Sequence, residues 1–341
     1  MREDWDRRIS HDYRFWMSDG HSCDQHMWET GRRDLELLIG DLPFKPDRTF
    51  LELGCGVGRL LKAASERFAH VIGVDVSEKA VTRANELLTN CDDVQVLLGN
   101  GYDLSEISSG SVDVAISFAA LTSMPTDVIA HYLTELHRVV TLHGLVRIQV
   151  YLGKEQPVKR NDTLHLRCYT VENFCNAVRA AGFSIEWLRE LTMPFQVSFK
   201  ELGIEATIVS LRRDERICQE SPKIAELLLP GGESEVTEVF NGTDLEYWMT
   251  VNYAKELVEH GDIERARDTL EYAVQFSGNT SIDVRDILDR IVKEVAEQTS
   301  PSTGGPAFLQ STDTKVEGST GAVYETNLKV IKDRFPELYA R

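Results

Sequence analysis

The sequence predicts an α/β protein, with a doubly wound and mostly parallel sheet of seven strands followed by an α-helical C-terminal extension. Apolar runs alternate with helical periodicities from Thr49 onward, which indicates parallel strands covered by helices on both faces. The first of these runs leads directly into a glycine-rich turn. After Arg213 the composition becomes acidic and the pattern helical, which indicates a separate extension.

Length and charge exclude several classes of protein. The 341 residues, 42% of them hydrophobic, can form one large domain and a smaller one. The excess of 55 Asp and Glu over 37 Lys and Arg gives a net charge of −18, which repels phosphate backbones and anionic lipid. We therefore expect no general nucleic-acid binding. We expect no membrane association either, because no apolar run approaches the ~20 residues that span a bilayer.

The cysteines and the first residues indicate a cytoplasmic protein. The six cysteines are scattered without a CxxC pair, which is typical of reduced thiols rather than disulfides. The charged beginning of the chain does not resemble a secretory signal. His21, Cys23 and His26 could supply three metal ligands, but no fourth ligand lies nearby, so no metal is expected.

The periodicity of the chain predicts its elements in order. Residues 1–36 are predicted to be helical, because their aromatic and aliphatic residues recur every three or four positions. The expected strands are residues 50–53, 71–74, 94–98, 112–118, 145–151, 184–191 and 205–211. The expected helices between them are residues 57–68, 77–90, 125–141 and 170–182. No long helix separates the last two strands, which indicates a hairpin-like pair.

The acidic extension resembles part of a tetratricopeptide repeat. Residues 214–300 contain 20 Asp and Glu against 8 Lys and Arg. Within them Gly261 permits a turn between helices, while Ala266 and Ala273 allow close helix packing. A single helix pair cannot bury its own apolar face, so it must pack against something else.

Residues 50–60 read FLELGCGVGRL, which is an apolar strand, a glycine turn and the start of a helix. Glycines in such a turn let the backbone approach a ligand and direct helix N-terminal amides toward it. The dinucleotide fingerprint requires a glycine three places after the second one, where this chain has Arg59. The turn therefore does not match a dinucleotide site.

With Glu52 two residues before the first glycine, the segment resembles the first motif of class I S-adenosylmethionine-dependent methyltransferases of the small-molecule type. The resemblance extends over about residues 45–212, with the parts in family order. It implies a Rossmann-like methyltransferase fold, an enzyme, and S-adenosylmethionine as the cofactor, with S-adenosylhomocysteine as its product.

The resemblance also implies roles for individual residues. Asp75 would accept hydrogen bonds from both ribose hydroxyls. Asn100 stands where the family often has Asp and could accept from the adenine amino group, and the end of the fourth strand would lie beside the methionine moiety. The implied cofactor-binding residues are Glu52, Gly54, Cys55, Gly56, Gly58, Asp75, Val76, Asn100, Gly101, Ser117 and Phe118.

The acceptor is expected to be a small-molecule hydroxyl, such as that of a sugar or natural product. Residues 117–125 (SFAALTSMP) lack the Asn/Asp-Pro-Pro-Tyr motif of methyltransferases that act on planar amines. Many small-molecule members place a histidine where this chain has Ser123. His165 is then the candidate catalytic base. The candidate substrate-binding residues are Tyr13, Gln149, Tyr151 and Arg167.

Five segments are expected: an N-terminal helical lid (1–44), the methyltransferase domain (45–213), the acidic helical extension (214–298), a flexible linker (299–321) and a C-terminal helix (322–341). Alternatives stay open. The chain could be a protein-interaction module, or it could bind the cofactor without turnover. The extension could dock a protein acceptor, a protein partner or a second copy in a homodimer.

Overall fold

The chain was analysed as a computed structural model. It forms two compact units, Met1–Glu238 and Val239–Arg341, and each is described by itself. The structure describes residues 2–17, 23–43, 45, 47–154, 158–159, 167–191, 204–232, 234–235, 242–277 and 283–299.

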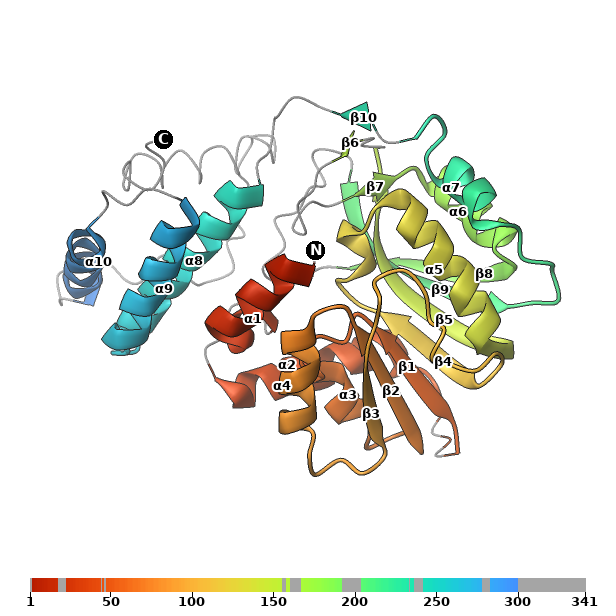
Figure 1. Cartoon of the computed structure of the whole chain (residues 1–341), viewed down its shortest axis with the longest axis horizontal. Helices are drawn as coiled ribbons and strands as arrows, with labels where there is room; N and C mark the ends of the chain where they lie inside the picture. The colour runs from red at the N-terminus through yellow and green to blue at the C-terminus, as the bar shows by residue number, and fades with distance from the viewer. Residues whose placement is uncertain are drawn as a thin grey trace. The chain divides into compact units, whose positions relative to one another are not determined.

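The first unit is built on a sheet in the order β3-β2-β1-β4-β5-β9-β8 (Figure 1). The five strands from β3 to β5 are parallel, and β9 is antiparallel to both of its neighbours. The doubly wound and mostly parallel sheet is therefore confirmed, including the antiparallel pairing of the last two strands. The strands are β1 (Thr49–Leu53), β2 (His70–Asp75), β3 (Val94–Leu98), β4 (Val112–Ser117), β5 (Val140–Gly153), β8 (Phe183–Glu190) and β9 (Ile204–Arg213).

The register of the sheet brings the carboxyl ends of its central strands together. Glu52 of β1 lies opposite Gly73 of β2 on one side and Ile116 of β4 on the other. The order of the strands reverses between β1 and β4, and ligands of open α/β sheets bind in the crevice that such a reversal creates. The glycine-rich turn after β1 lies at this point.

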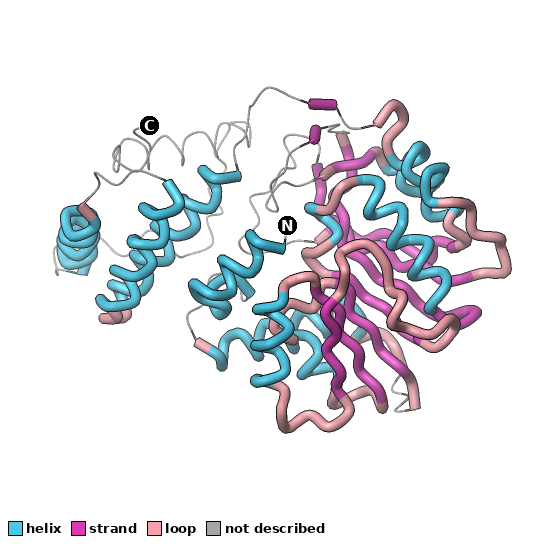
Figure 2. Tube along the Cα trace, viewed as in Figure 1, coloured by secondary structure: helices cyan, strands magenta, loops and turns pink. Residues whose placement is uncertain are grey.

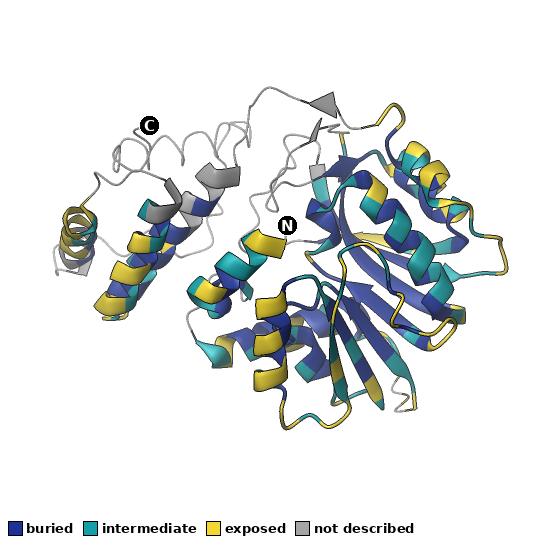
Figure 3. Cartoon of the chain, in the orientation of Figure 1, coloured by how far each residue is buried: buried dark blue, intermediate teal, exposed yellow. Residues whose placement is uncertain are grey.

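Helices cover both faces of the sheet, so that strands lie between helical layers (Figure 2). Apolar residues of α2 (Asp24–Ile39), α3 (Arg59–Ala64) and α4 (Glu78–Leu87) are buried on one face, together with Phe50 and Ile116. Those of α5 (Thr126–Val139) and α6 (Val171–Ala180) are buried on the other face, together with Leu51 and Ile148. The central strands are accordingly buried, whereas the outer face of α4 is exposed (Figure 3).

The predicted N-terminal helical segment forms α1 (Arg2–Met17) and α2. Helical geometry is interrupted at Asp12 (φ −160°, ψ 96°), whose carboxylate accepts a hydrogen bond from the backbone N–H of Arg14 at 3.1 Å. Asp12 thus caps the last turn of α1. Ile9 and Tyr13 of α1 are buried in a cluster with Val57 and Ala80, so α1 packs beside the glycine turn and α4.

The first unit continues past the expected boundary at Arg213. Helix α7 (Ser221–Leu228) buries Ile224 and Leu228 in the same core as α5 and α6. The acidic composition begins after β9, but α7 keeps an apolar stripe that belongs to the sheet's core, so a change in charge did not mark the boundary. The short strands β6 (Val158–Lys159) and β10 (Ser234–Glu235) pair in parallel, and β7 (Cys168–Tyr169) pairs in parallel with the end of β5.

The second unit contains α8 (Gly242–Glu259), α9 (Ile263–Ser277) and α10 (Val284–Thr299). Gly261 forms the turn between α8 and α9 with a φ of 80°, and Ala266 and Ala273 are buried. Helix α10 packs against both other helices. The helix pair is therefore present, while its likeness to a tetratricopeptide repeat stays a prediction. The expected linker and C-terminal helix lie outside the described residues.

Candidate active site

The glycine turn after β1 has a backbone conformation that residues with a side chain rarely adopt. Gly54, Gly56 and Gly58 all have positive φ, of 79°, 54° and 82°. A Cβ on Gly54 would lie 2.2 Å from Cβ of Ala120, and one on Gly56 would lie 2.5 Å from Sδ of Met17. Both positions thus favour glycine for their conformation, and Gly54 also for space, because the Met17 side chain can move away from Gly56. The turn brings bare backbone to the carboxyl end of β1.

Asp75 ends β2 and binds the glycine turn directly. Its carboxylate accepts from the backbone N–H of Gly56 at 2.8 Å and from that of Ser77 at 2.9 Å. Burial raises the pKa of Asp75, while the amides of Ser77 and Gly56 favour the charged form and oppose the rise. A carboxylate has about four acceptor positions, so the Asp75 oxygens keep capacity for a ligand's hydroxyl groups.

Glu52 is a buried carboxyl group with an unmet acceptor. Its side chain is 2% exposed, and its Oε2 has no hydrogen-bond partner among the described residues. Burial raises the pKa of Glu52 well above its ordinary value; the positive charge of Arg59 opposes this rise and the negative charge of Asp75 adds to it. A buried acceptor without a partner is costly, and a bound donor such as an ammonium group would remove that cost. This unmet acceptor at the end of β1 therefore fits the ammonium group of the cofactor's amino acid moiety.

The thiol of Cys55 is not a nucleophile in this environment. The side chain is 4% exposed, and burial raises the pKa of the thiol well above its ordinary value, so it stays protonated. Cys55 contributes a small side chain and a backbone carbonyl, which accepts from the N–H of Gly58 at 2.9 Å.

The loop after β3 uses Asn100 differently from the sequence expectation. Oδ1 of Asn100 accepts from the backbone N–H groups of Tyr102 at 2.8 Å and Asp103 at 2.9 Å. Both acceptor positions of Oδ1 are therefore engaged within the loop, so bonding to an adenine amino group would require one of these bonds to be given up. Gly101 lies against Val76, since a Cβ on it would be 3.1 Å from Val76 Cγ2.

The end of β4 is fixed by hydrogen bonds to both neighbouring strands. The hydroxyl of Ser117 donates to the carbonyl of Leu53 at 2.9 Å, which joins β4 to β1. Phe118 is buried beside it. Ala119 follows with a φ of 58°, a left-handed conformation that costs energy in a residue other than glycine. Its N–H donates to Oε1 of Gln149 at 3.0 Å.

The candidate substrate-binding residues of β5 and β7 mainly hold the segment after β4. Gln149 is fully buried, and its Nε2 makes no hydrogen bond with the described part of the chain. The backbone N–H of Arg167 donates to the carbonyl of Thr122 at 2.8 Å. The guanidinium of Arg167 donates to the carbonyl of Ser123. Tyr151 is buried, and burial raises the pKa of its hydroxyl group. Gln149 alone among these residues presents an unmet donor.

Tyr13 does not join this group in the structure. The hydroxyl of Tyr13 donates to Asp24 at 2.8 Å, between α1 and α2. Burial, together with the hydrogen bond to Asp24, raises the pKa of Tyr13 to about 12. Tyr13 is thus part of the packing within the N-terminal segment. His165 lies outside the described residues.

The N-terminal helix contributes site residues that the sequence did not indicate. Arg2 donates to the carbonyl of Val76 at 2.8 Å and to that of Gly99 at 3.1 Å. Asp6 accepts from the hydroxyl of Ser77 at 2.6 Å and from the backbone N–H of Lys79 at 3.0 Å. Helix α1 therefore closes onto the ends of β2 and β3. Its amphipathic pattern predicted a helix but contained no signal for these partners.

Arg59, where a dinucleotide site would have glycine, anchors helix α2. Its guanidinium pairs with the carboxylate of Asp34, a fully buried residue of α2. Gly31 of α2 is so close to this point that a Cβ on it would lie 2.3 Å from the carbonyl oxygen of Arg59. The ion pair therefore fixes α2 against the glycine turn.

The described ranges contain no cluster of three or more His, Cys, Asp or Glu side chains that could hold a metal. His21, one of the three candidate metal ligands, lies outside them. In the part of the chain that the structure describes, none of the helices is long and apolar enough to cross a membrane.

Comparisons with known proteins agree with this geometry. A family model described as a methyltransferase domain matches residues 50–144. Methoxy mycolic acid synthase MmaA3 of Mycobacterium tuberculosis is 25% identical over 226 residues, which cover 60% of this chain and 75% of that protein. Cyclopropane mycolic acid synthase 1 of the same species is 23% identical over 134 residues, covering 38% and 45%.

A solved structure shares the fold. Phosphoethanolamine N-methyltransferase 1 of Haemonchus contortus, in complex with phosphoethanolamine and S-adenosylhomocysteine, has a TM-score of 0.50 and 14% identity, over 67% of this chain and 52% of that one. The strand order, the glycine turn with its acidic residues, and the methyltransferase domain matched over residues 50–144 together support a class I S-adenosylmethionine-dependent methyltransferase.

Proposed function

We propose that the cofactor binds at the carboxyl ends of β1 to β4, where the buried acceptor of Glu52 faces no described partner. This observation carries the proposal, because a buried carboxyl group without a hydrogen bond indicates a missing ligand. The residues assigned to this site are Glu52, Gly54, Cys55, Gly56, Gly58, Asp75, Val76, Asn100, Gly101, Ser117 and Phe118.

Each group in this site has a physical task. Glu52 accepts from the cofactor's ammonium group, and Asp75 accepts from the ribose hydroxyls while it holds the N–H of Gly56. Gly54 and Gly56 keep the backbone within reach of the ligand. The lid, residues 1–44, excludes water through α1, whose Arg2 and Asp6 bind the ends of β2 and β3. S-Adenosylmethionine supplies the methyl group as a sulfonium.

We propose that the acceptor is a small molecule methylated on a hydroxyl group. The name of one relative, a methoxy mycolic acid synthase, supports transfer to oxygen. The name of another, a cyclopropane mycolic acid synthase, makes carbon the rival acceptor. The methyl acceptor would lie at the ends of β4 and β5. There Nε2 of Gln149 could donate a hydrogen bond to an oxygen of this molecule.

The base for a hydroxyl acceptor is proposed to be His165. Tyr151 is unsuited, because burial raises the pKa of its hydroxyl group and keeps it neutral. Gln149 and Arg167 cannot accept a proton at neutral pH. These residues orient the acceptor and the segment after β4.

The proposal is tested by methyl transfer from cofactor labelled with a deuterated methyl group. Purified protein is incubated with hydroxylated small molecules, including sugars and hydroxy fatty acids, and with unsaturated fatty acids. Mass spectrometry with fragmentation then locates the label. Label on oxygen supports O-methylation, and label on a former double bond supports the rival.

Two further outcomes are informative. Cofactor binding without transfer to any acceptor would favour the alternative of a protein that binds without turnover. His165→Ala is expected to abolish transfer while retaining cofactor binding, and the exposed His70→Ala serves as the control. Transfer at the wild-type rate in His165→Ala would remove the base assignment.

The acidic helices could serve a second purpose, since α8 to α10 belong to a compact unit of their own. We propose that this unit is a docking module for a protein partner or a second copy. Truncation after Glu238, rather than after Arg213, keeps α7 in the core. A truncated chain that stays folded and still binds cofactor supports the proposal, whereas precipitation would show that these helices complete the fold.

A further inference from the structure

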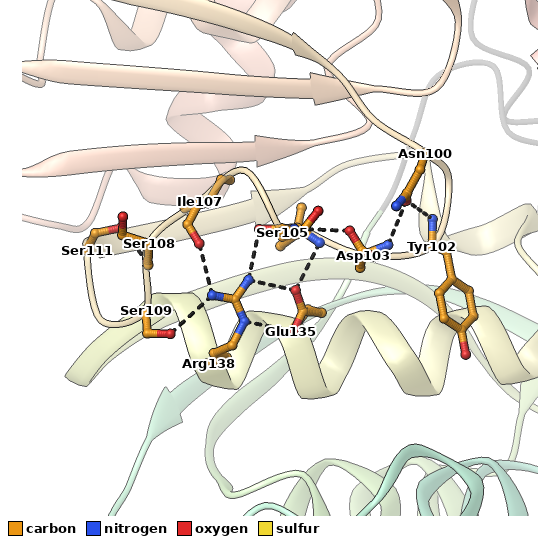
Figure 4. A network of polar contacts seen from close by, with 11 residues as sticks. Asn100, Tyr102, Asp103, Ser105, Ile107, Ser108, Ser109, Ser111, Glu135 and Arg138 are labelled. Atoms are coloured by element: carbon orange, nitrogen blue, oxygen red, sulfur yellow. Dashed lines mark hydrogen bonds and ion pairs between the residues drawn. The ribbon is translucent and has the colours of Figure 1, made fainter.

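The β3–β4 loop, residues 99–111, runs along the edge of the proposed cofactor site from the end of β3. It contains no regular helix or strand, so its position depends on contacts with other elements. Gly99 is held by Arg2 and by the carbonyl of Asp75, whereas the rest of the loop is held mainly by side chains of helix α5. Figure 4 shows the polar contacts that join the two.

Arg138 of α5 holds the second half of the loop. Its Nη1 donates to the carbonyl of Ile107 at 2.9 Å and to the hydroxyl of Ser109 at 3.1 Å, and its Nη2 donates to the carbonyl of Leu104 at 2.8 Å. One guanidinium thus satisfies three loop groups at once, which its planar fork permits and an ammonium group would not.

Glu135, one turn earlier on α5, fixes that guanidinium. Its two oxygens accept from Nε of Arg138 at 2.8 Å and from Nη2 at 2.7 Å. One of the same oxygens accepts from the backbone N–H of Leu104 at 3.0 Å. The hydrogen bond from Arg138 lowers the pKa of Glu135, so the pair stays charged at neutral pH. This bidentate pair is therefore a rigid clamp on Leu104.

The first half of the loop is fixed on the same helix. The ring of Tyr102 stacks on His131 of α5, with centroids 4.0 Å apart and planes inclined by 14°. The backbone N–H groups of Tyr102 and Asp103 hold Oδ1 of Asn100, which sets the direction of the whole amide. Hydrogen bonds from Ser105 and from the side chain of Asn100 lower the pKa of Asp103, so the amide donor of Asn100 is also held within the loop.

We propose that Arg138 and Glu135 are positioning residues that set how tightly, and how selectively, this loop binds the base of the cofactor. The inference rests on the proposed cofactor site. Arg138 and Glu135 do not touch the ligand themselves; they hold Leu104 and Ile107, and the loop in turn orients Asn100 and the backbone beside it. Loss of the clamp lets the loop move, which weakens binding of the base and reduces its discrimination.

The test compares two ligands by titration calorimetry on the full chain. S-Adenosylhomocysteine carries adenine, and S-inosylhomocysteine carries hypoxanthine, whose amino group is replaced by oxygen and whose N1 is protonated. Arg138→Met is expected to weaken the binding of S-adenosylhomocysteine about tenfold and the binding of the inosine analogue less, so that the preference for adenine falls. Glu135→Gln is expected to raise both dissociation constants by a smaller factor.

Arg212→Met is the matched control. Arg212 also pairs with a glutamate, Glu186, and also donates to a backbone carbonyl, that of His143 in β5, but it lies at the other end of the sheet. It is expected to lower thermal stability without changing either dissociation constant. If Arg138→Met proves insoluble, Glu135→Gln decides the question.

The outcomes separate this inference from the proposed function. Wild-type protein that binds neither ligand would overturn the cofactor site itself. Wild-type binding with no preference for adenine, or an unchanged preference in both α5 variants, would overturn only the positioning role and leave the clamp as a structural contact.

Discussion

The two sides of the proposed active site differ in the groups that form them: backbone on the cofactor side and side chains on the acceptor side. The cofactor side, at the ends of β1 and β2, consists mainly of backbone: three glycines with positive φ and the amides that Asp75 holds. The acceptor side, at the ends of β4 and β5, consists of side chains that hold one another in place. Gln149 holds the amide of Ala119, and Arg167 holds the carbonyl of Ser123.

This difference has a physical consequence. Backbone geometry requires particular residue types at fixed spacing, so substitutions on the cofactor side should act on ligand binding. Side chains that satisfy buried backbone groups contribute to folding, so substitutions on the acceptor side should act first on stability. The comparison also explains why one side could be recognised in the sequence and the other only in part.

The largest effect is expected from Gly54→Ala. Its φ of 79° disfavours a side chain, and the new Cβ would overlap that of Ala120. We expect S-adenosylhomocysteine binding to weaken by about a hundredfold. Gly231→Ala is the control, because Gly231 has a φ of 84° but no atom within 4 Å of its added Cβ. Equal binding by Gly54→Ala and wild type would contradict the backbone-built cofactor side.

The next effect concerns the acceptor side. Gln149→Met keeps the length of the side chain but removes the acceptor of the N–H of Ala119, in a part-buried hydrogen bond. We expect the free energy of unfolding, measured with denaturant, to fall by about 0.5–1.5 kcal/mol. Gln25→Met, at an exposed position of α2, should leave it nearly unchanged. If Gln149→Met keeps full stability but loses ligand binding, the distinction between the two sides fails.

Glu52 belongs to the cofactor side, and we expect it to lower the stability of the free protein while it strengthens ligand binding. Its pKa is raised in the folded state by burial, so the folded chain binds more protons than the unfolded one above the ordinary value of 4.5. Its contribution to stability is thus present below that value and is lost as the pH rises toward its folded pKa. We expect Glu52→Gln to raise the melting temperature at pH 7 to 8.

The same substitution should weaken binding of S-adenosylhomocysteine, because the neutral amide loses the charge that attracts an ammonium group. Glu36→Gln, at an exposed position of α2, is the control for both measurements. A Glu52→Gln protein that is less stable than wild type and binds the ligand normally would show that Glu52 has a structural role instead.

The smallest effect is expected at acidic pH and concerns His137, which lies outside the proposed site. Burial lowers the pKa of His137; Arg213 adds to this, and groups of Arg216 and Asp214 oppose it. The unfolded chain therefore binds the proton more readily, so stability should fall as the pH drops below about 6.5. His137→Gln should flatten the melting temperature between pH 5 and 7, and the exposed His70→Gln should not. An unaltered profile in His137→Gln would assign the acid sensitivity to other groups.

Much of the fold could be predicted, because it follows from local patterns. Alternating apolar runs gave the seven strands within a few residues, and Gly54 to Gly58 are adjacent in the sequence. Arg2 binds the carbonyl of Val76 across 74 positions, and no local signal contains such a contact. The left-handed conformation of Ala119 could not be predicted either, because a positive φ is expected from the sequence mainly at glycine.

The boundary of the first unit and the role of Asn100 show the same limit. Charge composition changes after Arg213, yet α7 still buries Ile224 in the core, and burial depends on tertiary packing. An asparagine offers the same Oδ1 to a ligand or to its own backbone, and the structure alone shows that the backbone amides of Tyr102 and Asp103 bind it. Sequence patterns predicted where the site lies but did not assign each hydrogen bond.

The most direct test of the central claim is calorimetric titration of S-adenosylhomocysteine into wild type and Asp75→Ala. Asp113→Ala is the control, because Asp113 also accepts from a backbone N–H, that of Thr49, but at the opposite end of the sheet. We predict that wild type and Asp113→Ala bind the ligand with similar affinity and that Asp75→Ala binds it at least about tenfold more weakly. Equal affinity in Asp75→Ala and wild type would show that the cofactor does not bind at the ends of β1 and β2.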